Sequence, residues 1–350
     1  MGKRFTIALP VRNGGEYIKL AVASVMAQTV PDFELVVLDN ASTDGTSEWL
    51  DSLRDERVRV IRSERSLSIE ENWHRIVEIP KREFLTCLGH DDLLHADFLA
   101  EISRLIEQYP DGALYQTHFE IIDADGNRTR PCLPMPAREA GPEFAAARFA
   151  YIRDSYGTGY VIRSVDYDSI GGMPCYAGLM FADDALWLQA LRLRDRFKYT
   201  SQRECFSYRF HPASARNTAP QTAVDGMAGY VGFLRDSAAT DPLLSEVLAR
   251  YAEGYFLSFA HLLYRTALAK ASARGEVLDS KLLDTLAVAL DGFVTRPAAE
   301  MLRESGRIRL LERINRSSRR KILQRLVDTA RGPRARFWAR LGHQLSGLDE

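Results

Sequence analysis

Residues 6–46 have the sequence TIALPVRNGGEYIKLAVASVMAQTVPDFELVVLDNASTDGT. Residues 5–9 and 34–38 are short runs of β-branched and other apolar side chains, which favour β-strands. Between them, apolar residues recur at helical spacing, at Ile18, Ala21, Val22, Val25 and Met26. The order strand, amphipathic helix, strand predicts an α/β domain in which helices cover a parallel sheet.

The same alternation continues along the chain. Further strands are predicted over residues 58–61, 84–88, 114–122 and 158–162. A helix is expected to begin at Ser68, because Glu71 three residues later completes a capping box. The stretch 131–142 is rich in proline and small residues and predicts a loop, and residues 183–193 predict a helix.

The last third of the chain has a different pattern. From about Ala223 the strand signals stop, and apolar residues between 244 and 262 recur at spacings of three and four, which predicts one long helix. We therefore expect two domains, an α/β domain over residues 1–220 and a helical region over residues 221–350.

Composition and charge exclude several classes of protein. The hydrophobic fraction of 46% is that of a globular protein, and the net charge of −1 gives no overall field for nucleic acid. The four cysteines form no C-x-x-C pair, so reduced thiols are expected. No leader and no apolar run of about 18 residues is visible, and we expect a cytoplasmic protein.

Polar residues follow three of the predicted strands. The first strand ends in Pro10–Asn13, the second in Asp39 and Asn40, and the fourth in Gly89-His90-Asp91-Asp92. A single carboxylate at a strand end is commonly a helix cap. Three polar ends together indicate a ligand site, because ligands of open parallel sheets bind at the carboxyl ends of the strands.

The adjacent carboxylates Asp91 and Asp92 point to a metal ion. Two neighbouring negative charges are costly unless a cation neutralises them. Magnesium or manganese prefers carboxylate oxygen and commonly shares its coordination with phosphates, so a nucleotide diphosphate is a natural partner. The alternative is that Asp92 only caps the following helix.

Residues 6–46 resemble the opening of the family-two glycosyltransferases with a GT-A fold. That family has Pro-x-x-Asn after the first strand, Ser-x-x-x-Gln at the end of the helix and Asp-Asp/Asn-x-Ser-x-Asp-Gly-Thr after the second strand. The matching residues here are Pro10, Asn13, Ser24, Gln28, Asp39, Ser42, Asp44, Gly45 and Thr46. The resemblance implies a mixed, mostly parallel sheet, a nucleotide site lined by Pro10, Val11 and Asn13, and a hydrogen bond from the base to Asp39.

The resemblance implies further residues for the nucleotide-sugar and metal sites. Besides those named, the expected nucleotide-sugar site comprises Arg12, Glu16, Asn40, Asn72, His90, Asp91 and Arg209. Gly89 stands at the first position of the family's Asp-x-Asp, so the match is to Asp91 and Asp92. Residues 208–211, Tyr-Arg-Phe-His, are similar to the family's Tyr-Arg-x-His. The expected ligands of the divalent metal are therefore Asp91, Asp92 and His211.

A third matching block supplies the catalytic base. Aligning Leu186-Trp187-Leu188 on the family's Leu-Trp-Leu places Asp183 on the base and Ala182 on a position that is usually glutamate. A carboxylate there could take the proton of the acceptor hydroxyl as its oxygen attacks the anomeric carbon in line. Asp184 is the neighbouring candidate, and both side chains could instead cap the helix that follows.

The region from Arg303 to Arg340 is rich in arginine and lysine, with apolar residues interleaved. A basic amphipathic helix can lie on an anionic membrane surface, which suits a lipid-linked acceptor. It can equally be a solvated helix that packs on the catalytic domain or on another copy in a homo-oligomer. No nucleic-acid binding is expected, because no recognised module accompanies the charge.

The sequence thus predicts a metal-dependent, inverting glycosyltransferase of the bacterial polysaccharide or glycoconjugate type. It would move a sugar from a nucleotide-diphosphate sugar to a hydroxyl of a glycan or lipid-linked acceptor, without a covalent intermediate. One alternative is a nucleotidyltransferase of similar fold, but Asn13-Gly14-Gly15-Glu16 lacks the arginine and lysine of a triphosphate loop. The other is an inactive relative with a binding or scaffolding role.

Overall fold

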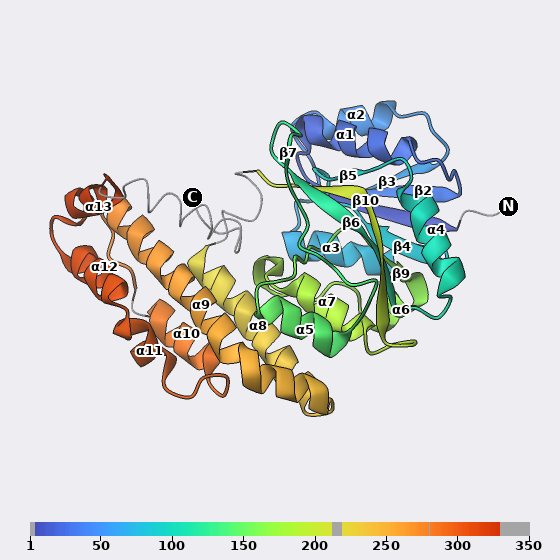
Figure 1. The fold of residues 1–350 in the computed structure, drawn as a ribbon. Coiled ribbons are helices and arrows are strands. Elements are labelled where there is room, and N and C mark those ends of the chain that lie inside the picture. The colour runs from blue at the N-terminus through green and yellow to red at the C-terminus, as the bar shows by residue number, and fades with distance from the viewer. Residues whose placement is uncertain (1–3, 212–218, 280, 330–350) are drawn as a thin grey trace. The chain divides into compact units, whose positions relative to one another are not determined.

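The computed structural model describes residues 4–211, 219–279 and 281–329 of the 350-residue chain. Its contacts divide the chain into two units, which Figure 1 shows from blue to red along the sequence. The first comprises Met1–Ala145 and Ile152–Ser214, and the second Ala146–Tyr151 and Ala215–Glu350. Nothing in the sequence pattern indicated that residues 146–151 would group with the second unit.

The first unit is built on one mixed sheet of ten strands in the described residues. These are β1 (Phe5–Val11), β2 (Phe33–Asp39), β3 (Val58–Arg62), β4 (Phe84–Cys87), β5 (Leu93–Leu94), β6 (Leu114–Ile122), β7 (Arg128–Pro131), β8 (Arg138–Ala140), β9 (Tyr160–Arg163) and β10 (Phe197–Arg209). The order is β3-β2-β1-β4-β9-β6-β10-β5, with β7 on β6 and β8 on β10.

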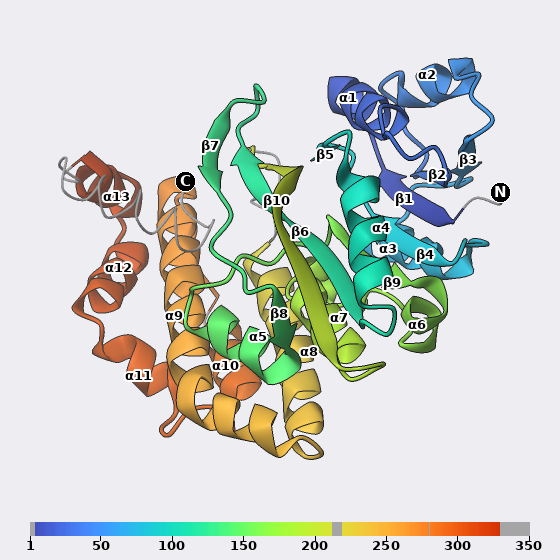
Figure 2. The ribbon, with the colours of Figure 1, turned by 45° about the vertical axis from the view of Figure 1, so that its right-hand side comes forward.

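Parallel pairing prevails where the sequence predicted it. Strands β3, β2, β1 and β4 are mutually parallel, and so are β6 and β10, which run side by side in Figure 2. Strand β9 lies antiparallel between β4 and β6 and makes the sheet mixed. The predicted α/β class and the predicted strands are confirmed.

The predicted loop over residues 131–142 is wrong in part. Strand β8 lies within it, paired with β10, and helix α5 (Gly141–Phe149) begins directly after it. The side chain of Glu139 in β8 is buried and lies 2.8 Å from the Lys198 ammonium of β10. A strand this short is specified by its partner strand rather than by its own composition, which is why its sequence did not reveal it.

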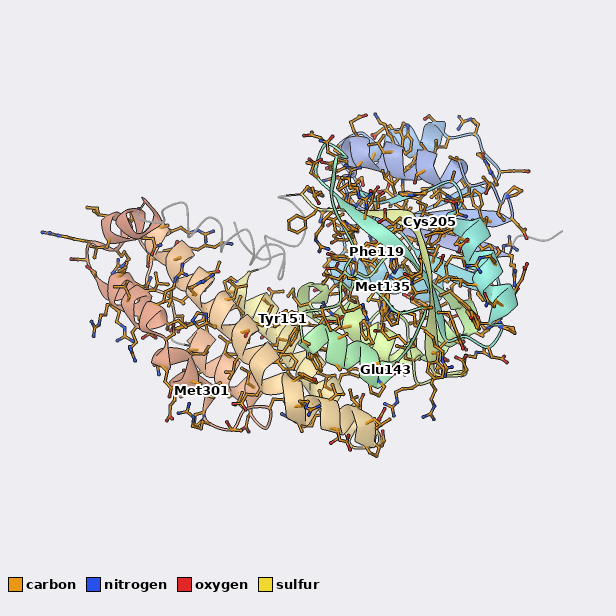
Figure 3. The ribbon with its side chains drawn as sticks, in the orientation of Figure 1. Phe119, Met135, Glu143, Tyr151, Cys205 and Met301 are labelled. Atoms are coloured by element: carbon orange, nitrogen blue, oxygen red, sulfur yellow. The ribbon has the colours of Figure 1, made fainter. Side chains whose placement is uncertain are left out.

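Helices cover both faces of the sheet because the strands are apolar on both faces. Side chains of β1 and β2 form one core with α1 (Gly15–Met26), α2 (Thr46–Ser52) and α4 (Phe98–Gln108). Figure 3 labels three members of this core, Phe119, Met135 and Cys205. On the other face lie α3 (Ile69–Glu78), α6 (Ser164–Ser169) and, after the 3₁₀ turn Ala177–Leu179, α7 (Ala182–Ala190). The predicted capping box of Ser68 and Glu71 is present at the start of α3.

The second unit is helical in the residues described. Its helices after the sheet are α8 (Pro220–Ala238), α9 (Pro242–Arg274), α10 (Lys281–Leu290), α11 (Ala298–Glu304), α12 (Gly306–Arg316) and α13 (Arg320–Thr329). Helix α9 contains the predicted long helix; Asp241 caps its start and Gly275, in the left-handed region, ends it. Among the described residues, 4–211, 219–279 and 281–329, no helix is both long enough and apolar enough to cross a bilayer.

Candidate active site

Strand order places the segments that follow β1, β2 and β4 next to one another at one edge of the sheet. Strand β1 pairs with β2 on one side and with β4 on the other, so the direction of the chain connections reverses between β1 and β4. Ligands of open α/β sheets bind outside the carboxyl ends of the strands at such a switch point. The segments that follow β1, β2 and β4 contain Asn13, Asn40 and Asp91 respectively.

The segments after β1 and β2 are joined by hydrogen bonds. The backbone N–H of Asn13 donates to Ser42 Oγ at 2.9 Å. The side-chain oxygen of Asn13 accepts from the backbone N–H of Thr43 at 2.8 Å. The Gly15 amide donates to Asp44 Oδ2 at 3.0 Å. Asn13 has a positive φ of 54°, a conformation that asparagine tolerates better than most residues. Several residues of the family motif thus act together to fix this loop pair.

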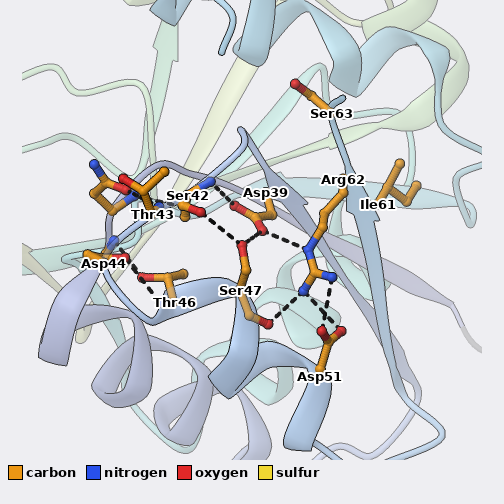
Figure 4. A network of polar contacts seen from close by, with 12 residues as sticks. Asp39, Ser42, Thr43, Asp44, Thr46, Ser47, Asp51, Ile61, Arg62 and Ser63 are labelled. Atoms are coloured by element: carbon orange, nitrogen blue, oxygen red, sulfur yellow. Dashed lines mark hydrogen bonds and ion pairs between the residues drawn. The ribbon is translucent and has the colours of Figure 1, made fainter. Parts of the chain in front are cut away.

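Asp39 lies at the end of β2 within the polar network of Figure 4. Its carboxylate accepts from Ser47 Oγ at 2.5 Å, from Arg62 Nε at 3.0 Å and from the Ser42 amide at 3.2 Å. Burial alone would raise the pKa of Asp39, but these hydrogen bonds outweigh burial and lower it. The side chain is 0% exposed, and its predicted contact with the base stays a prediction.

Two other predicted residues hold the surrounding segments. The Asn40 side chain both donates to and accepts from the backbone of Leu67, at 3.0 and 2.7 Å. The buried Asn72 accepts from Arg75, which also donates to the carbonyl oxygens of Asp39 and Ile61. This is a bracing role that the sequence did not reveal.

The remaining predictions at this end of the sheet concern α1 and the end of β1. Pro10 and Val11 are buried in β1, whereas Arg12 and Glu16 are exposed. The Glu16 carboxylate lies 2.5 Å from the Lys19 ammonium on the same helix. Their contacts with a nucleotide sugar stay predictions.

The segment after β4 brings two predicted metal ligands together. His211 Nε2 lies 2.9 Å from Asp91 Oδ2, although the two residues come from different ends of the domain sequence. Burial would raise the pKa of Asp91, but the hydrogen bond with His211 and the nearby His90 keep it below its ordinary value. Burial lowers the pKa of His90 below its ordinary value. This pair can present one oxygen and one nitrogen to a ligand.

The neighbouring Asp92 carboxylate bonds to Thr158 and to the backbone of Arg209. It is 1% exposed, and its two oxygens accept from Thr158 Oγ1 at 2.8 Å and from the Arg209 amide at 2.9 Å. Burial and the adjacent charge of Asp91 raise the pKa of Asp92 well above its ordinary value. The alternative that Asp92 caps the next helix is wrong, because α4 begins only at Phe98 and Asp92 bonds to other elements.

Arg209 holds the backbone of the segment that contains Asp91 through hydrogen bonds. Its guanidinium donates to the carbonyl oxygens of Asp91, Asp123 and Ala124 at 2.7, 3.0 and 3.1 Å, and it lies over the Tyr17 ring. The Tyr17 ring is also 5.2 Å from that of His211. The sequence reasoning missed Tyr17 and Thr158, and no motif signal could have found them because both act through contacts distant in the chain.

The donor set fits a divalent metal in part. Across the described ranges 4–211, 219–279 and 281–329, no group of three or more His, Cys, Asp and Glu side chains is arranged to hold a metal. Asp91 and His211 supply two donors of types that manganese accepts, and phosphates and water commonly complete such a shell. A β carbon on Gly89 would lie 2.7 Å from Asp92 Oδ2, so this arrangement leaves no room for the family's first aspartate.

The predicted base lies at the start of α7. Asp184 is 1% exposed, whereas Asp183 is partly exposed and accepts from the Asp184 amide at 2.9 Å. The N-cap residue Phe181 makes no side-chain cap hydrogen bond. A β carbon on Gly157 would lie 3.8 Å from that of Asp183, so a glycine borders this carboxylate.

Tyr208 of β10 links the two groups of carboxylates. Burial raises the pKa of Tyr208 well above its ordinary value, and the charges of Asp92, Asp91 and Asp183 raise it further. Its ring stacks on Tyr156 at 3.7 Å between centroids. The two groups of carboxylates also border neighbouring residues, since Gly157 lies beside Asp183 and Thr158 donates to Asp92 at 2.8 Å.

Residues 6–164 match the model of glycosyl transferase family 2. The chain is 22% identical over 129 residues to glycosyltransferase GlyG of Streptococcus pneumoniae, covering 36% of this chain and 43% of that protein. It is 23% identical over 267 residues to an uncharacterized glycosyltransferase of Rickettsia typhi, covering 73% and 82%. The match spans less than half the length of the first two curated relatives.

The fold is similar to solved structures of Staphylococcus aureus TarS. Its segment 1–349 superimposes with a TM-score of 0.58 at 16% identity, covering 92% of this chain and 91% of that one. The family match covers residues 6–164, which is less than half of the chain. Together with the sheet and the similarity to TarS, it shows that the first unit has the GT-A fold of a family 2 glycosyltransferase domain. The class of protein that the sequence predicted is confirmed.

Proposed function

We propose that this protein transfers a sugar from a nucleotide-diphosphate sugar to an acceptor hydroxyl, with inversion at the anomeric carbon. The observation that carries the proposal is the placement of Asp91 with His211, 2.9 Å apart, at the switch point of the sheet. A structure of TarS in complex with UDP-GlcNAc, whose fold is similar, supports a nucleotide-sugar donor. Manganese or magnesium is the proposed cofactor.

Asp183 is the better candidate for the general base. A base must reach the acceptor proton, and Asp183 is partly exposed whereas Asp184 is buried. The ionised Asp183 carboxylate takes the proton as the acceptor oxygen attacks the anomeric carbon. One displacement inverts that carbon, and no side chain of the protein acts as a nucleophile.

Asp91 and His211 would hold the metal, which when bound offsets the charge that grows on the leaving diphosphate. Arg209 fixes the backbone of Asp91, and Asp92 fixes that of Arg209, so both act by positioning. Asn13, Asp44 and Ser42 hold the segments next to the donor in one arrangement. This preorganisation reduces the entropy cost of ordering the loops when the substrate binds.

The acceptor class rests on relatives alone. TuaG of Bacillus subtilis, 29% identical over 96 residues, is named for teichuronic acid biosynthesis and supports a glycan hydroxyl. A lipid-linked glycan fits the same chemistry. The family match favours glycosyl transfer over the nucleotidyltransferase alternative, and a homo-oligomer stays a prediction.

A panel of nucleotide sugars tests the donor site. We expect one member, with manganese present, to raise the melting temperature, since a ligand that binds only the folded state stabilises it. Omitting the metal should reduce the shift. If no member changes the melting temperature with or without metal, the donor site is wrong and the inactive relative becomes the better interpretation.

Substitution tests the base. Asp183→Asn should lower kcat by about 100- to 10,000-fold while donor affinity stays close to normal, because only proton transfer is lost. The neighbouring Asp184→Asn is the matched comparison and should retain most of the turnover if it folds. Normal turnover in Asp183→Asn, with loss in Asp184→Asn, would move the role to Asp184.

A further inference from the structure

Helix α12 has two chemically distinct faces. Ile308, Leu311 and Ile314 are buried, and the helix packs against α9. Arg309, Arg313 and Arg316 project from the opposite face at spacings of four and three, and all three are exposed. The apolar face is therefore already used within the helical unit, and a cationic row is left at the surface.

The acidic side chains near this row are engaged elsewhere. Glu312, the acid of α12, accepts from Tyr264 Oη at 2.9 Å and lies 3.4 Å from the Arg303 guanidinium. Glu304 forms its ion pair with Arg296 at 2.8 Å, and Arg309 is a weaker electrostatic neighbour of it. Residues 303–324 contain eight cationic and two acidic side chains, although the whole chain has a net charge of −1. The positive charge is thus concentrated in a segment of an otherwise acidic molecule.

Large aliphatic side chains are exposed beside the cations. Leu310 of α12 is 49% exposed, and Ile322 of α13 is 62% exposed. Arg319 and Lys321, which precede Ile322, are also exposed. Cations with interspersed aliphatic side chains match the headgroup region of an anionic bilayer, where phosphate lies next to hydrocarbon.

We propose that the cationic row of α12, defined as Arg309, Leu310, Arg313 and Arg316, is an adsorption surface for an anionic lipid bilayer. Arginine binds phosphate through two parallel hydrogen bonds, so headgroups are well suited to it. A polyanion such as single-stranded nucleic acid fits less well, because the large exposed apolar side chains of α12 and α13 are aliphatic and offer no stacking platform. Binding is by adsorption, since the buried face of α12 is not available for insertion.

This inference concerns a partner and does not depend on the proposed transfer reaction. The consequence for acceptor choice does rest on that reaction: a membrane-bound glycosyltransferase meets a lipid-linked acceptor in two dimensions, so the surface would favour such acceptors among glycans. Adsorption should weaken as salt rises, because the interaction is mainly electrostatic.

Vesicle sedimentation of the full chain tests the proposal. We expect the protein to pellet with phosphatidylcholine vesicles containing about 30 mol% phosphatidylglycerol and to stay in the supernatant with pure phosphatidylcholine. The variant Arg309→Gln, Arg313→Gln, Arg316→Gln should reduce partitioning roughly 100-fold. A matched control, Arg54→Gln, Arg65→Gln, Arg250→Gln, removes the same charge from exposed positions elsewhere and should bind nearly as the wild type does.

Several outcomes would overturn the proposal. They are equal recovery with both kinds of vesicle, undiminished binding of the row variant, or an equal loss in the control variant. Binding to a single-stranded oligonucleotide in preference to the anionic vesicles would replace lipid with nucleic acid. If the triple variant melts early, the single variant Arg313→Gln keeps the test valid, with an expected weakening of about fivefold.

Discussion

Asp39 and Asp92 are both buried carboxylates at the switch-point edge of the sheet, yet their pKa values are shifted in opposite directions. Asp39 has the Arg62 guanidinium and two hydroxyl or amide donors, and its pKa is lowered. Asp92 accepts from the Thr158 hydroxyl and from a backbone amide, and its burial and the adjacent charge of Asp91 raise its pKa. The charge of Asp39 is balanced by Arg62. The segment of Asp91 and Asp92 keeps negative charge that a bound cation could offset.

The largest loss of activity is expected on substitution of Asp91, which lies beside Asp92. Asp91→Asn should lower metal-stimulated kcat/KM about 100-fold or more, because the proposed ion loses an anionic ligand. Its unfolding free energy should fall by only about 1 kcal/mol, the value of one partly exposed hydrogen bond. Steady-state kinetics against manganese concentration, with urea unfolding, measure both.

His211→Gln is the partner variant for that measurement. If Asp91 and His211 act as one site, the double variant should lose little more activity than either single variant. Fully additive losses would show that the two side chains act separately, and the comparison between the two regions would lose its basis.

A stability loss of intermediate size is expected at Asp39. Asp39→Asn should cost about 2 kcal/mol of unfolding free energy at pH 7, since Arg62 loses its buried carboxylate partner and keeps only the more exposed Asp51. Asp51→Asn is the matched control, because Asp51 pairs with the same arginine but is 64% exposed, and it should cost under about 1 kcal/mol. Equal costs would mean that burial of Asp39 does not matter.

The pH dependence should show the same ion pair. Because the folded-state pKa of Asp39 lies below its ordinary value of 3.8, its stabilising effect is present above pH 3.8 and is lost as pH falls through the folded-state pKa. The difference in unfolding free energy between wild type and Asp39→Asn should therefore shrink on acidification. A difference that stays constant from neutral pH to below 3.8 would contradict the assigned direction.

The smallest effect is expected at Asp92. Asp92→Asn should change the unfolding free energy by less than about 1 kcal/mol, since an amide can accept from Arg209 and donate to the Thr158 hydroxyl while no charge is buried. Urea denaturation in the presence of a chelator measures it. A loss as large as that of Asp39→Asn would show that Asp92 is held as an ion and would erase the contrast between the two regions.

Much of the fold could be predicted because its signals are local. Strands β1 and β2 are mostly apolar runs, and the capping box of Ser68 and Glu71 marks the start of α3. Strand β8 was not predicted because its buried Glu139 pairs with Lys198 of β10, a strand that is adjacent in the sheet but distant in the sequence. Its polar sequence therefore carries no local sign of burial.

The candidate site divides in the same way. Adjacent aspartates and a histidine in a family motif sufficed to nominate Asp91, Asp92 and His211, and a partial alignment nominated Asp183. Which of them face one another was not encoded locally. Only the tertiary contacts turned Asp92 toward Thr158 and brought His211 to Asp91.

The sequence by itself determined the class of fold, the family and the chemical types of the site residues, because apolar periodicity and motif spacing are properties of neighbouring positions. The tertiary structure decided which carboxylate is neutralised, which is buried beside another charge and which remains accessible. Those properties depend on solvent exclusion and on partners tens of residues away, such as Arg62 for Asp39 and Arg209 for Asp92.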